Sequence, residues 1–494
     1  MKKASWFEII AARCWNLLNE GKPFTPIFVV GVFYLYHISL WGELSFWKNT
    51  ILGLFLILPL FIIYYHYDFP LYLRNYLWIP LIAYLIIFSE TELFLVLMAI
   101  GLYFFFTVFF WGTFYYHLRI GTSWLNFTRF WKLVLKNSDS TSGNAQEQLP
   151  KFILLLSIWQ FAFQSMYHQG VGFYELPWFT ILSFCFGVFI FSWILHRYIF
   201  DWKPKENEEL TIEKSSNPVG NPITDKVIVI VIDGMRKDKF KEANTPFLDD
   251  MRLKGTEYTH METVYPARTV VCFSSMFTGT YPKEHGITSN MVWKLGLKVE
   301  SIFDSLRKVG KKGRLLGIAH LIDSFGKDVE SVTAVMNNDV ADLNIMQRAK
   351  HIMSEQDPDF LVVQFIGTDQ TGHSRGVHYP DYIQKIEEVD SLIEQFVTWL
   401  DEQGKKQDTT FIICADHGQA DGIGGHGHLD EGERYVPFFI YGPQVHQGKR
   451  VEEKNSLISV APTVATLLGS PYPSHSRGRV LKEALNIDGE ENKN

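Results

Sequence analysis

Hydrophobic positions divide the chain into two unlike halves. Residues 1–200 are crowded with Phe, Leu, Ile, Trp and Tyr. They contain six stretches near the roughly 17–25 apolar residues needed to cross a bilayer, at 24–41, 50–66, 71–88, 93–112, 152–168 and 177–195. These stretches are apolar on every face, which is typical of transmembrane helices and not of the helices of a soluble bundle. Residues 1–200 are therefore predicted to form an all-α transmembrane domain of about six helices.

Residues 226–487 follow a different pattern, in which short apolar runs alternate with amphipathic segments. The apolar runs are Val227–Ile232, Phe360–Ile366, Thr410–Ala415 and Phe438–Tyr441. Unbroken runs of this length predict strands buried on both faces of a parallel sheet. Helical patterns lie between them, at 299–309, 339–355 and 382–402. This alternation predicts an α/β domain with a mainly parallel central sheet and helices on both faces.

Two polar segments complete the predicted organisation. Residues 201–225 are charged and then rich in Pro, Asn and Gly, which indicates a linker between the two domains. Residues 488–494 are polar and are predicted to be a disordered tail.

Composition narrows the functional classes only slightly. The mean hydropathy of +0.01 averages the two halves, and the net charge of −7 with a pI near 6.2 argues against a nucleic-acid binder. The four cysteines, Cys14, Cys185, Cys272 and Cys414, are scattered and do not resemble a disulfide framework. This is compatible with a reducing compartment.

The distribution of basic residues predicts the orientation of the chain in the membrane. Arg74 and Pro80 make the third span the weakest of the six, and the orientation depends on it. With six spans, the loops assigned to the cytoplasm hold Lys2, Lys3, Arg13, Lys22, Arg74, Arg119, Arg129, Lys132, Lys136, Lys151, Arg197, Lys203 and Lys205. The loops assigned to the other side hold only Lys48. This bias favours a multi-pass protein of the cell membrane with its globular domain in the cytoplasm.

Acidic residues follow three of the predicted strands. Asp233 comes directly after the first apolar run, Asp369 lies three residues beyond the second, and Asp416 follows the third. A single Asp at a strand end is often only a turn former or helix cap. However, ligands of open α/β sheets gather at the carboxyl ends of strands, and His373 and His417 lie close to two of these aspartates. We therefore expect the three aspartates and two histidines to meet in one site.

The residue types at this site suit divalent metal ions and phosphoryl transfer. Carboxylate and imidazole together bind Zn²⁺ or Mn²⁺, and a pair of ions could hold both the attacking and the leaving oxygen of a displacement at phosphorus. A hydroxyl nucleophile is then required, and Thr269 is the candidate. A threonine before an apolar helix is usually an N-cap. That role is compatible with catalysis, because a helix N-terminus also stabilises a bound phosphoryl group.

The ordered motifs of this domain resemble the alkaline phosphatase superfamily, and within it the type I phosphodiesterase/nucleotide pyrophosphatase branch. The resemblance covers about residues 226–445 and is carried by Val231-Ile232-Asp233-Gly234-Met235-Arg236, Asn244-Thr245-Pro246-Phe247-Leu248, Thr269 to Thr278-Gly279, Tyr281-Pro282, His285-Gly286-Ile287, Asp369-Gln370-Thr371-Gly372-His373 and Asp416-His417-Gly418. It implies two bound divalent ions, Zn²⁺ first and Mn²⁺ as the alternative. It also implies that Thr269 attacks phosphorus, forms a phosphothreonine intermediate and passes the phosphoryl group to water or to an alcohol.

The same resemblance assigns the ligands of each ion. Asp233, Thr269, Asp416 and His417 would hold one ion, and Asp369, His373 and a further histidine would hold the other. The further histidine comes from Gly424-Gly425-His426-Gly427-His428, where His426 fits the family spacing better than His428. His285 matches a position that is usually structural.

One departure from the family pattern concerns the substrate pocket. The phosphodiesterase branch has Thr-x-Pro-Asn at the nucleophile, whereas this chain has Thr269-Val270-Val271-Cys272. Cys272 thus replaces an asparagine that, by the resemblance, would help to hold the transferred group, so we expect a different substrate pocket. Sulfatases need a modifiable Cys or Ser at the nucleophile position, so Thr269 argues against that branch.

We predict a membrane-anchored, metal-dependent phosphodiesterase or phosphatase that hydrolyses phosphate esters, with a lipid-linked or nucleotide substrate near the bilayer. The alternative is a phosphoglycerol or phosphoethanolamine transferase acting on envelope lipids or polymers, as lipoteichoic acid synthases do outside the cytoplasm. A metal-binding sensor without activity is a third interpretation. The expected partners are the lipid bilayer and a phosphate ester, with no nucleic acid.

Overall fold

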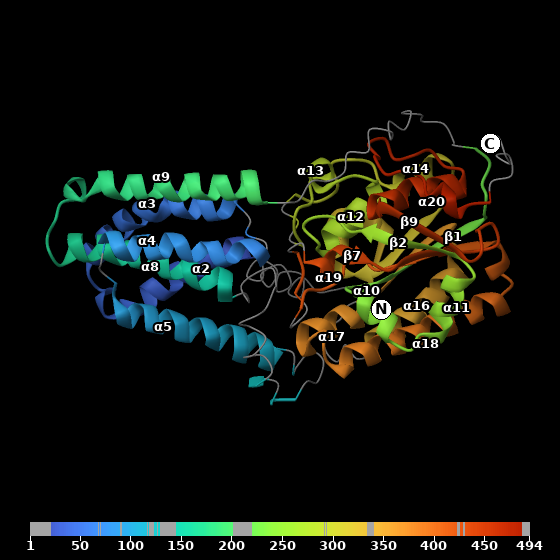
Figure 1. Ribbon diagram of the computed structural model, residues 1–494, viewed down its shortest axis with the longest axis horizontal. Helices are drawn as coiled ribbons and strands as arrows, with labels where there is room; N and C mark the ends of the chain where they lie inside the picture. Colours follow the sequence, from blue (N-terminus) through green and yellow to red (C-terminus); the bar gives the residue numbers. More distant parts are fainter. Residues whose placement is uncertain are drawn as a thin grey trace. The chain divides into compact units, whose positions relative to one another are not determined.

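The computed structural model describes residues 21–67, 69, 71–88, 91–115, 117, 123–125, 127–128, 145–200, 220–290, 292, 294–332, 340–421, 425–427 and 430–486. The chain divides into two compact units (Figure 1). The helical unit comprises Met1–Tyr115 and Trp124–Lys203, and the α/β unit comprises Pro204–Asn494 together with Tyr116–Ser123. The predicted linker at 201–225 lies mostly outside the described residues, and so does the predicted tail at 488–494. Each unit is described by itself.

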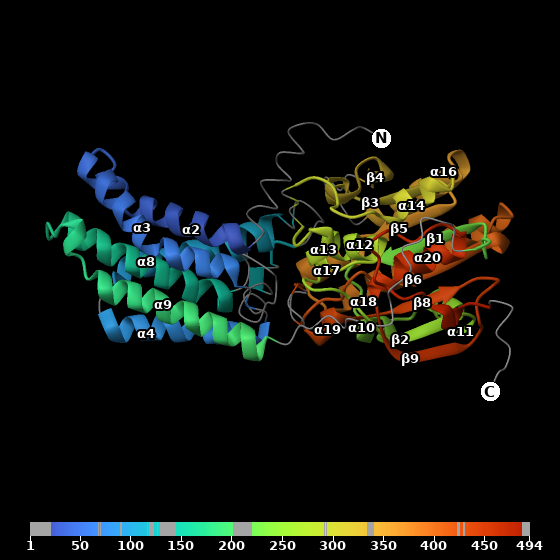
Figure 2. The ribbon, with the colours of Figure 1, turned by 90° about the horizontal axis from the view of Figure 1, so that it is seen from above.

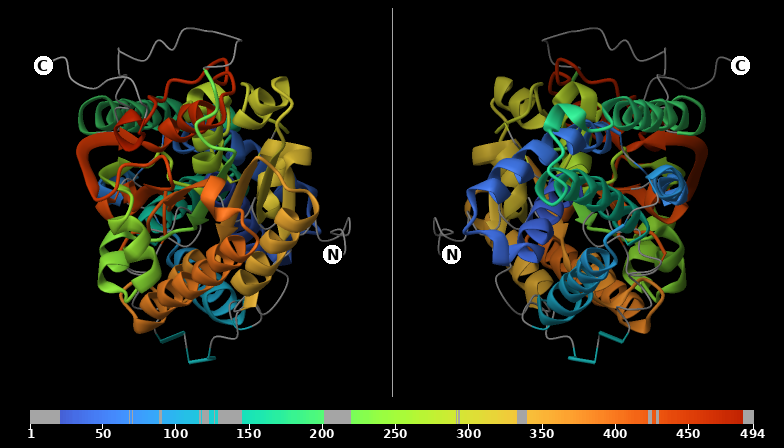
Figure 3. Two further views of the ribbon diagram at one scale, coloured as in Figure 1. Left: turned by 90° about the vertical axis from the view of Figure 1, so that its right-hand side faces the viewer. Right: turned by 90° about the vertical axis from the view of Figure 1, so that its left-hand side faces the viewer.

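The helical unit has helices at all six of the predicted spans. They are α2 (Gly21–Tyr36), α3 (Leu44–His66), α4 (Trp78–Phe88), α5 (Leu93–Phe104) continued by η3 (Phe105–Tyr115), α8 (Ala145–Tyr167), and α9 (Trp178–Ile194) continued by η5 (Leu195–Ile199). The right-hand panel of Figure 3 shows the helices of this unit from another side. Among the described residues, three segments are long and apolar enough to cross a membrane, namely Leu44–His66, Leu93–Phe110 and Trp178–Ile199. The protein is thus a membrane protein, and the number of crossings stays a prediction.

Polar side chains explain why α8 differs from an ordinary lipid-facing span. Most of its residues are buried, including Gln148, Lys151 and Gln160. Gln148 accepts a 2.7 Å hydrogen bond from Thr25, and Gln160 lies 2.9 Å from the His37 ring nitrogen Nε2. Paired polar groups of this kind are tolerated inside an apolar bundle. We infer that α8 is the central helix of the unit.

Contacts between helix ends show which helix ends lie together in the helical unit. The start of α2 meets the start of α8 through Thr25 and Gln148, and Arg74 before α4 lies 3.4 Å from Glu147 of α8. Tyr67 after α3 contacts His196 at the end of α9, with ring centroids 4.7 Å apart. These contacts place the beginning of α2 and the end of α9 at the same end of the helical unit. An even number of crossings follows if every helix spans the membrane.

A nine-stranded sheet forms the centre of the α/β unit, in the order β4-β3-β5-β1-β6-β8-β2-β7, with β9 paired to β2 (Figure 2). The strands are β1 (Lys226–Ile232), β2 (Thr256–Glu262), β3 (Gly313–Ile318), β4 (Val329–Val332), β5 (Phe360–Phe365), β6 (Thr409–Cys414), β7 (Tyr435–Val436), β8 (Phe438–Tyr441) and β9 (Lys449–Ser456). The strands from β4 to β6 are parallel, and β8 is antiparallel to β6. The mainly parallel α/β fold is therefore confirmed.

Helices cover both faces of this sheet (Figure 1). They are α10 (Lys237–Glu242), α11 (Pro246–Leu253), α12 (Thr269–Thr278), α13 (Pro282–His285), α14 (Ile302–Lys308), α15 (Ile322–Phe325), α16 (Ala341–Glu355), α17 (Gly367–Arg375), α18 (Pro380–Glu402), α19 (Glu431–Arg434) and α20 (Val460–Leu468). Helices α12, α14 and α20 lie on one face, while α16 and α18 lie on the other. Strand β1 is buried along almost its whole length because it lies between β5 and β6.

The strand register brings the predicted site residues to one edge of the sheet. Ile232 of β1 pairs with Phe365 of β5, and Val231 pairs with Cys414 of β6. These three neighbouring strands therefore end at nearly the same level, and the residues that follow them share the carboxyl edge of the sheet.

Candidate metal centre

Three predicted ligands meet at the ends of β1 and β6. The Asp233 atom Oδ1 lies 3.5 Å from Nε2 of His417, and the Asp416 atom Oδ2 lies 3.4 Å from the same nitrogen. All three side chains are buried. Asp233 Oδ1 and Asp416 Oδ2 have no hydrogen-bond partner among the described residues. Two buried carboxylate oxygens without donors, turned toward one imidazole nitrogen, are what a bound cation would satisfy.

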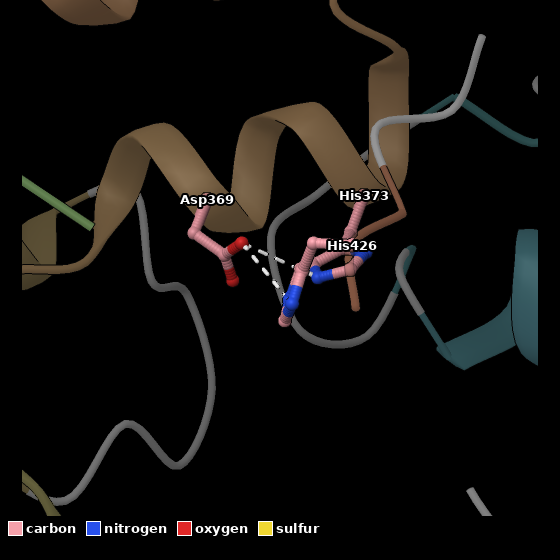
Figure 4. Close-up of side chains that lie close together, drawn as sticks. All are labelled: Asp369, His373 and His426. Carbon is pink, nitrogen blue, oxygen red and sulfur yellow. Dashed lines mark ion pairs between the residues drawn. The ribbon is translucent and has the colours of Figure 1, made fainter. Parts of the chain in front are cut away.

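A second group of ligands lies at α17, which follows β5. Asp369 and His373 are four residues apart on this helix, and His426 comes from the loop after β6 (Figure 4). The Asp369 atom Oδ1 lies 3.3 Å from Nε2 of His373 and 3.7 Å from Nε2 of His426. His428, the alternative to His426, lies outside the described residues. The structure thus brings His426 to the place that the predicted seventh ligand would occupy.

The spacing within both groups fits a small divalent ion. The ligand atoms of each group all lie within 4.8 Å of one another. Around a tetrahedral ion with bonds of about 2.0 Å, neighbouring ligand atoms are separated by roughly 3.3 Å, close to the distances found here. The two groups are adjacent, since the rings of His417 and His426 are stacked with centroids 3.9 Å apart. The donors present therefore fit two neighbouring divalent ions.

Hydrogen bonds to the outer ring nitrogens leave the inner ones available for a metal. Nδ1 of His417 lies 2.8 Å from the Gly418 carbonyl, and Nδ1 of His426 lies 2.7 Å from the Ala267 carbonyl. A carbonyl can only accept, so Nδ1 must carry the proton in both rings. The Nε2 lone pairs then face the carboxylates. Such outer hydrogen bonds are characteristic of metal-binding histidines.

The pKa values of the aspartates are shifted in opposite directions in the two ligand groups. Burial, followed by the neighbouring Asp416 and Asp369 carboxylates, raises the pKa of Asp233 well above its ordinary value. Burial also raises the pKa of Asp416. At Asp369, burial acts in the same direction, but His373, His426 and His417 outweigh it and hold the pKa below its usual range. The first group thus gathers carboxylates that repel one another, which a divalent cation would relieve.

Thr269 is the first residue of α12, and Arg268 occupies the N-cap position without a side-chain capping bond. The proposed N-cap role of Thr269 is therefore wrong. Its hydroxyl Oγ1 instead lies 3.3 Å from Nε2 of His417, within the first ligand group. The side chain is buried in the first turn of the helix, where backbone N–H groups have no partner within the helix.

Two residues close to Thr269, Asn290 and Cys272, make contacts that the sequence does not predict. Asn290 was not recognised, yet its Oδ1 accepts a 3.0 Å hydrogen bond from the backbone N–H of Val270. This fixes an amide group at the N-terminus of α12. Cys272, which stands where the phosphodiesterase branch has an asparagine, is fully buried, and its Sγ lies 3.3 Å from the Thr263 hydroxyl. Asn290 therefore supplies an amide close to Thr269, which Cys272 does not.

A buried carboxylate positions the helix that carries Asp369 and His373. Oδ1 of Asp342 accepts hydrogen bonds of 2.8 Å from the N–H of Ile366 and 3.1 Å from that of Gly367, at the start of α17. Burial raises the pKa of Asp342 to about 6, although both backbone donors lower it. Compared with the unfolded chain, the folded protein thus favours the protonated form of the Asp342 side chain. The stability linked to this proton is present below pH 4 and is lost as the pH rises toward 6.

Replacing Asp342 by Asn is expected to remove this pH dependence. Relative to the variant, the wild type should lose about 2 kcal/mol of unfolding free energy between pH 4 and pH 7. Denaturant unfolding of both proteins at each pH measures the difference, in which the other titrating groups cancel. A difference that is constant across this pH range would show that Asp342 does not titrate as stated.

Comparison with protein families identifies the α/β unit. Residues 225–472, half of the chain, match the model of the metalloenzyme superfamily. The chain belongs to the metalloenzyme superfamily. This membership supports the alkaline phosphatase-like resemblance and implies a divalent metal in a phosphoester-processing enzyme.

Curated relatives of this metalloenzyme are transferases. It is 25% identical over 285 residues to the human protein "GPI ethanolamine phosphate transferase 2, catalytic subunit", covering 53% of this chain and 28% of the relative. The Schizosaccharomyces pombe protein "GPI ethanolamine phosphate transferase 2" is 25% identical over 337 residues, covering 61% of this chain and 44% of the relative. The chain thus spans less than half the length of these relatives. Their names favour the transferase alternative over the predicted hydrolase.

Solved structures similar to the metalloenzyme include the alkaline phosphatase PafA, with a TM-score of 0.46 and 13% identity over 54% of this chain and 100% of that chain. Murine ectonucleotide pyrophosphatase/phosphodiesterase 5 gives a TM-score of 0.44 and 14% identity over 50% of this chain and 96% of that chain.

Proposed function

We propose that this protein is a membrane-bound transferase that moves a phosphoethanolamine group, or a closely related headgroup phosphodiester, from a lipid donor to a hydroxyl acceptor through Thr269. The observation that carries the proposal is the position of the Thr269 hydroxyl, which is buried within the first ligand group and adjacent to the second. The names of the curated relatives support transfer, and the apolar helices support a lipid donor.

The chemistry requires two displacements at phosphorus. In the first, the Thr269 oxygen forms a bond to phosphorus while the bond to the diacylglycerol oxygen breaks, and the threonine proton ends on the released alcohol. In the second, the acceptor hydroxyl displaces phosphorus from Thr269 and the threonine hydroxyl is restored. When bound, two divalent ions would supply charge neutralisation at the attacking and leaving oxygens. Zn²⁺ is the ion we propose first, with Mn²⁺ as the alternative.

The chain itself supplies orientation in both steps. The N-terminus of α12 directs backbone N–H groups toward a phosphoryl group on Thr269. Asn290 accepts from the Val270 N–H through Oδ1, so its Nδ2 hydrogens are left to donate to a phosphoryl oxygen. Nε2 of His417 lies beside the threonine hydroxyl and, as a ligand atom, fixes where that hydroxyl sits.

A transfer assay on the full-length protein in lipid nanodiscs tests the proposal. The donor is phosphatidylethanolamine labelled in its headgroup, and the acceptor is an amphiphile with free sugar hydroxyls. We expect label on the acceptor in equal amount to the diacylglycerol released. Label recovered only as free phosphoethanolamine, with diacylglycerol released, would identify a hydrolase and overturn the transferase proposal.

The orientation of the catalytic unit is a separate proposal, based on charge. The helix ends near the start of α2 carry Arg74, Lys151 and Arg197, whereas the opposite ends carry only Lys48 among the described Lys and Arg residues. This predicts a cytoplasmic catalytic unit. Leu253 is exposed and the three described cysteines are buried. Leu253→Cys should therefore react with an impermeant maleimide only after the cells are permeabilised. Labelling in intact cells would overturn the topology without touching the proposed chemistry.

A further inference from the structure

We propose that two buried glutamines, Gln364 and Gln419, are positioning residues of the metal centre, each orienting one carboxylate ligand. Gln364 acts on Asp233 in the first ligand group, and Gln419 acts on Asp369 in the second. The inference depends on the metal centre and not on the group that is transferred.

Gln364 is the only polar residue of the fully buried strand β5, whose sequence is Phe-Leu-Val-Val-Gln-Phe. Its Nε2 donates a 2.6 Å hydrogen bond to Oδ2 of Asp233, and its Oε1 accepts a 2.9 Å hydrogen bond from the N–H of Ile318 at the end of β3. A backbone N–H can only donate, so the orientation of the amide is fixed.

This pair of bonds determines which Asp233 oxygen is available to a metal. With Oδ2 held by Gln364, the carboxylate plane is fixed, and Oδ1 is left 3.5 Å from Nε2 of His417 without a hydrogen-bond partner among the described residues. This arrangement favours metal binding.

Gln419 connects the two ligand groups. It follows Asp416 and His417 of the first group along the chain. Its Nε2 donates to Oδ1 of Asp369 at 2.8 Å and to the Asp369 carbonyl at 3.1 Å. The loop that presents the first group is thereby tied to the helix that presents the second.

Glycines provide the space for both glutamines. A Cβ on Gly317 would lie 2.5 Å from Oε1 of Gln364, and a Cβ on Gly372 would lie 1.6 Å from Oε1 of Gln419. A Cβ on Gly234 would lie 2.8 Å from Nε2 of Gln419. The glycine between Asp369 and His373 is thus explained by the close approach of Gln419, and not by a turn, since Gly372 lies within α17.

One end of the Gln419 side-chain amide is unsatisfied. Its Oε1 is buried and has no hydrogen-bond partner among the described residues, so this end of the amide destabilises the fold. Only the Nε2 end, which contacts Asp369, has favourable contacts. Replacement by methionine, similar in size but without polar atoms, removes the unsatisfied Oε1 together with the two Nε2 hydrogen bonds, so the net change in the stability of the metal-free protein should be small.

The test measures the metal affinity of the full-length protein by competition with a chromophoric chelator. In a His426→Ala background, where the first group remains, Gln364→Met should lower Zn²⁺ affinity about 10- to 100-fold while Gln419→Met leaves it unchanged. In an Asp416→Asn background, where the second group remains, the two effects should be reversed. Gln356→Met is the matched control, because Gln356 bonds Arg314 at a distance from the ligands.

Two further readouts separate positioning from a structural role. The melting temperature of metal-free Gln419→Met should lie close to that of the metal-free wild type, and excess Zn²⁺ should restore the activity of both single variants. Unchanged affinities in both backgrounds would overturn the proposal. A loss of affinity that follows a lowered metal-free melting temperature, and that excess metal does not rescue, would also overturn it. These outcomes are read from metal binding and so are distinct from a failure of the transfer assay.

Discussion

Replacing Thr269 by valine is expected to lower the transfer rate by roughly four to six orders of magnitude, the scale of losses seen when a covalent nucleophile is removed. Valine keeps the branched shape of threonine at this buried helix start but lacks the hydroxyl that lies beside His417. Without that oxygen, no bond to phosphorus can form on the protein. The measurement is the release of diacylglycerol from labelled phosphatidylethanolamine in nanodiscs.

Thr269→Ser is the matched control for this prediction. Serine retains the hydroxyl and should keep transfer within about a hundred-fold of the wild type, since only its orientation is less restrained. If the valine variant transfers as fast as the serine variant, the nucleophile lies elsewhere. A valine variant that fails to bind metal would instead report the predicted second role of Thr269 as a ligand.

Replacing His426 by alanine is expected to reduce the bound metal from two equivalents to one and to lower transfer by at least about a hundred-fold, because even partners outside the ligand set cost 10- to 100-fold. His426 presents Nε2 to Asp369 and is fixed through Nδ1 by the Ala267 carbonyl. Metal content is measured by elemental analysis after dialysis against a trace of free Zn²⁺.

His428→Ala provides the matched control, since His428 lies two residues away in the same Gly-rich segment. It should retain two equivalents of metal and most of the activity. The reverse result, with metal lost from the His428 variant and retained by the His426 variant, would assign the ligand to His428.

The central part of the fold could be predicted from the sequence because burial imposes a simple pattern. Strands β1, β5, β6 and β8 lie in or beside the middle of the sheet, and their continuous apolar runs were recognised. Strands β2 and β9 were not, since Thr-Glu-Tyr-Thr-His-Met-Glu and Lys-Arg-Val-Glu-Glu-Lys-Asn-Ser are polar strands away from that centre. A strand with one solvated face carries too little apolar signal to be separated from a loop.

The helical half shows a similar limit. All six apolar stretches are helical, but α8 begins seven residues before the predicted start at residue 152 and includes Glu147 and Lys151. Its polar residues pair with other helices of the unit, and such pairs are invisible in a hydropathy pattern. The number of crossings therefore stays a prediction.

At the site, motif spacing predicted which aspartates and histidines come together, but not the residues that contact them. The structure brings Asp233, Asp416 and His417 together, and likewise Asp369, His373 and His426, because neighbouring strands end at one edge of the sheet. Asn290, Gln364 and Gln419 were missed. A single amide in an apolar strand or a polar loop carries no periodic signal, and its role depends on contacts between distant segments. The predicted N-cap at Thr269 was wrong because Arg268 takes that position.

The reaction type was the least determined by the sequence. The ligands and nucleophile of a hydrolase and of a transferase are the same, since the two differ only in whether water or an alcohol accepts the phosphoryl group. The curated relatives favour the transferase alternative, and the hydrolase prediction gives way to it.

Mass spectrometry of the acid-quenched protein can detect the covalent intermediate on Thr269 itself. The full-length enzyme is mixed with metal and phosphatidylethanolamine, quenched within the first turnover, and digested. We expect a peptide containing Thr269 that carries one phosphoethanolamine group, is absent from Thr269→Val, and disappears when a hydroxyl acceptor is added. Transfer at the wild-type rate with no adduct on Thr269, or with the adduct on another residue, would contradict this expectation.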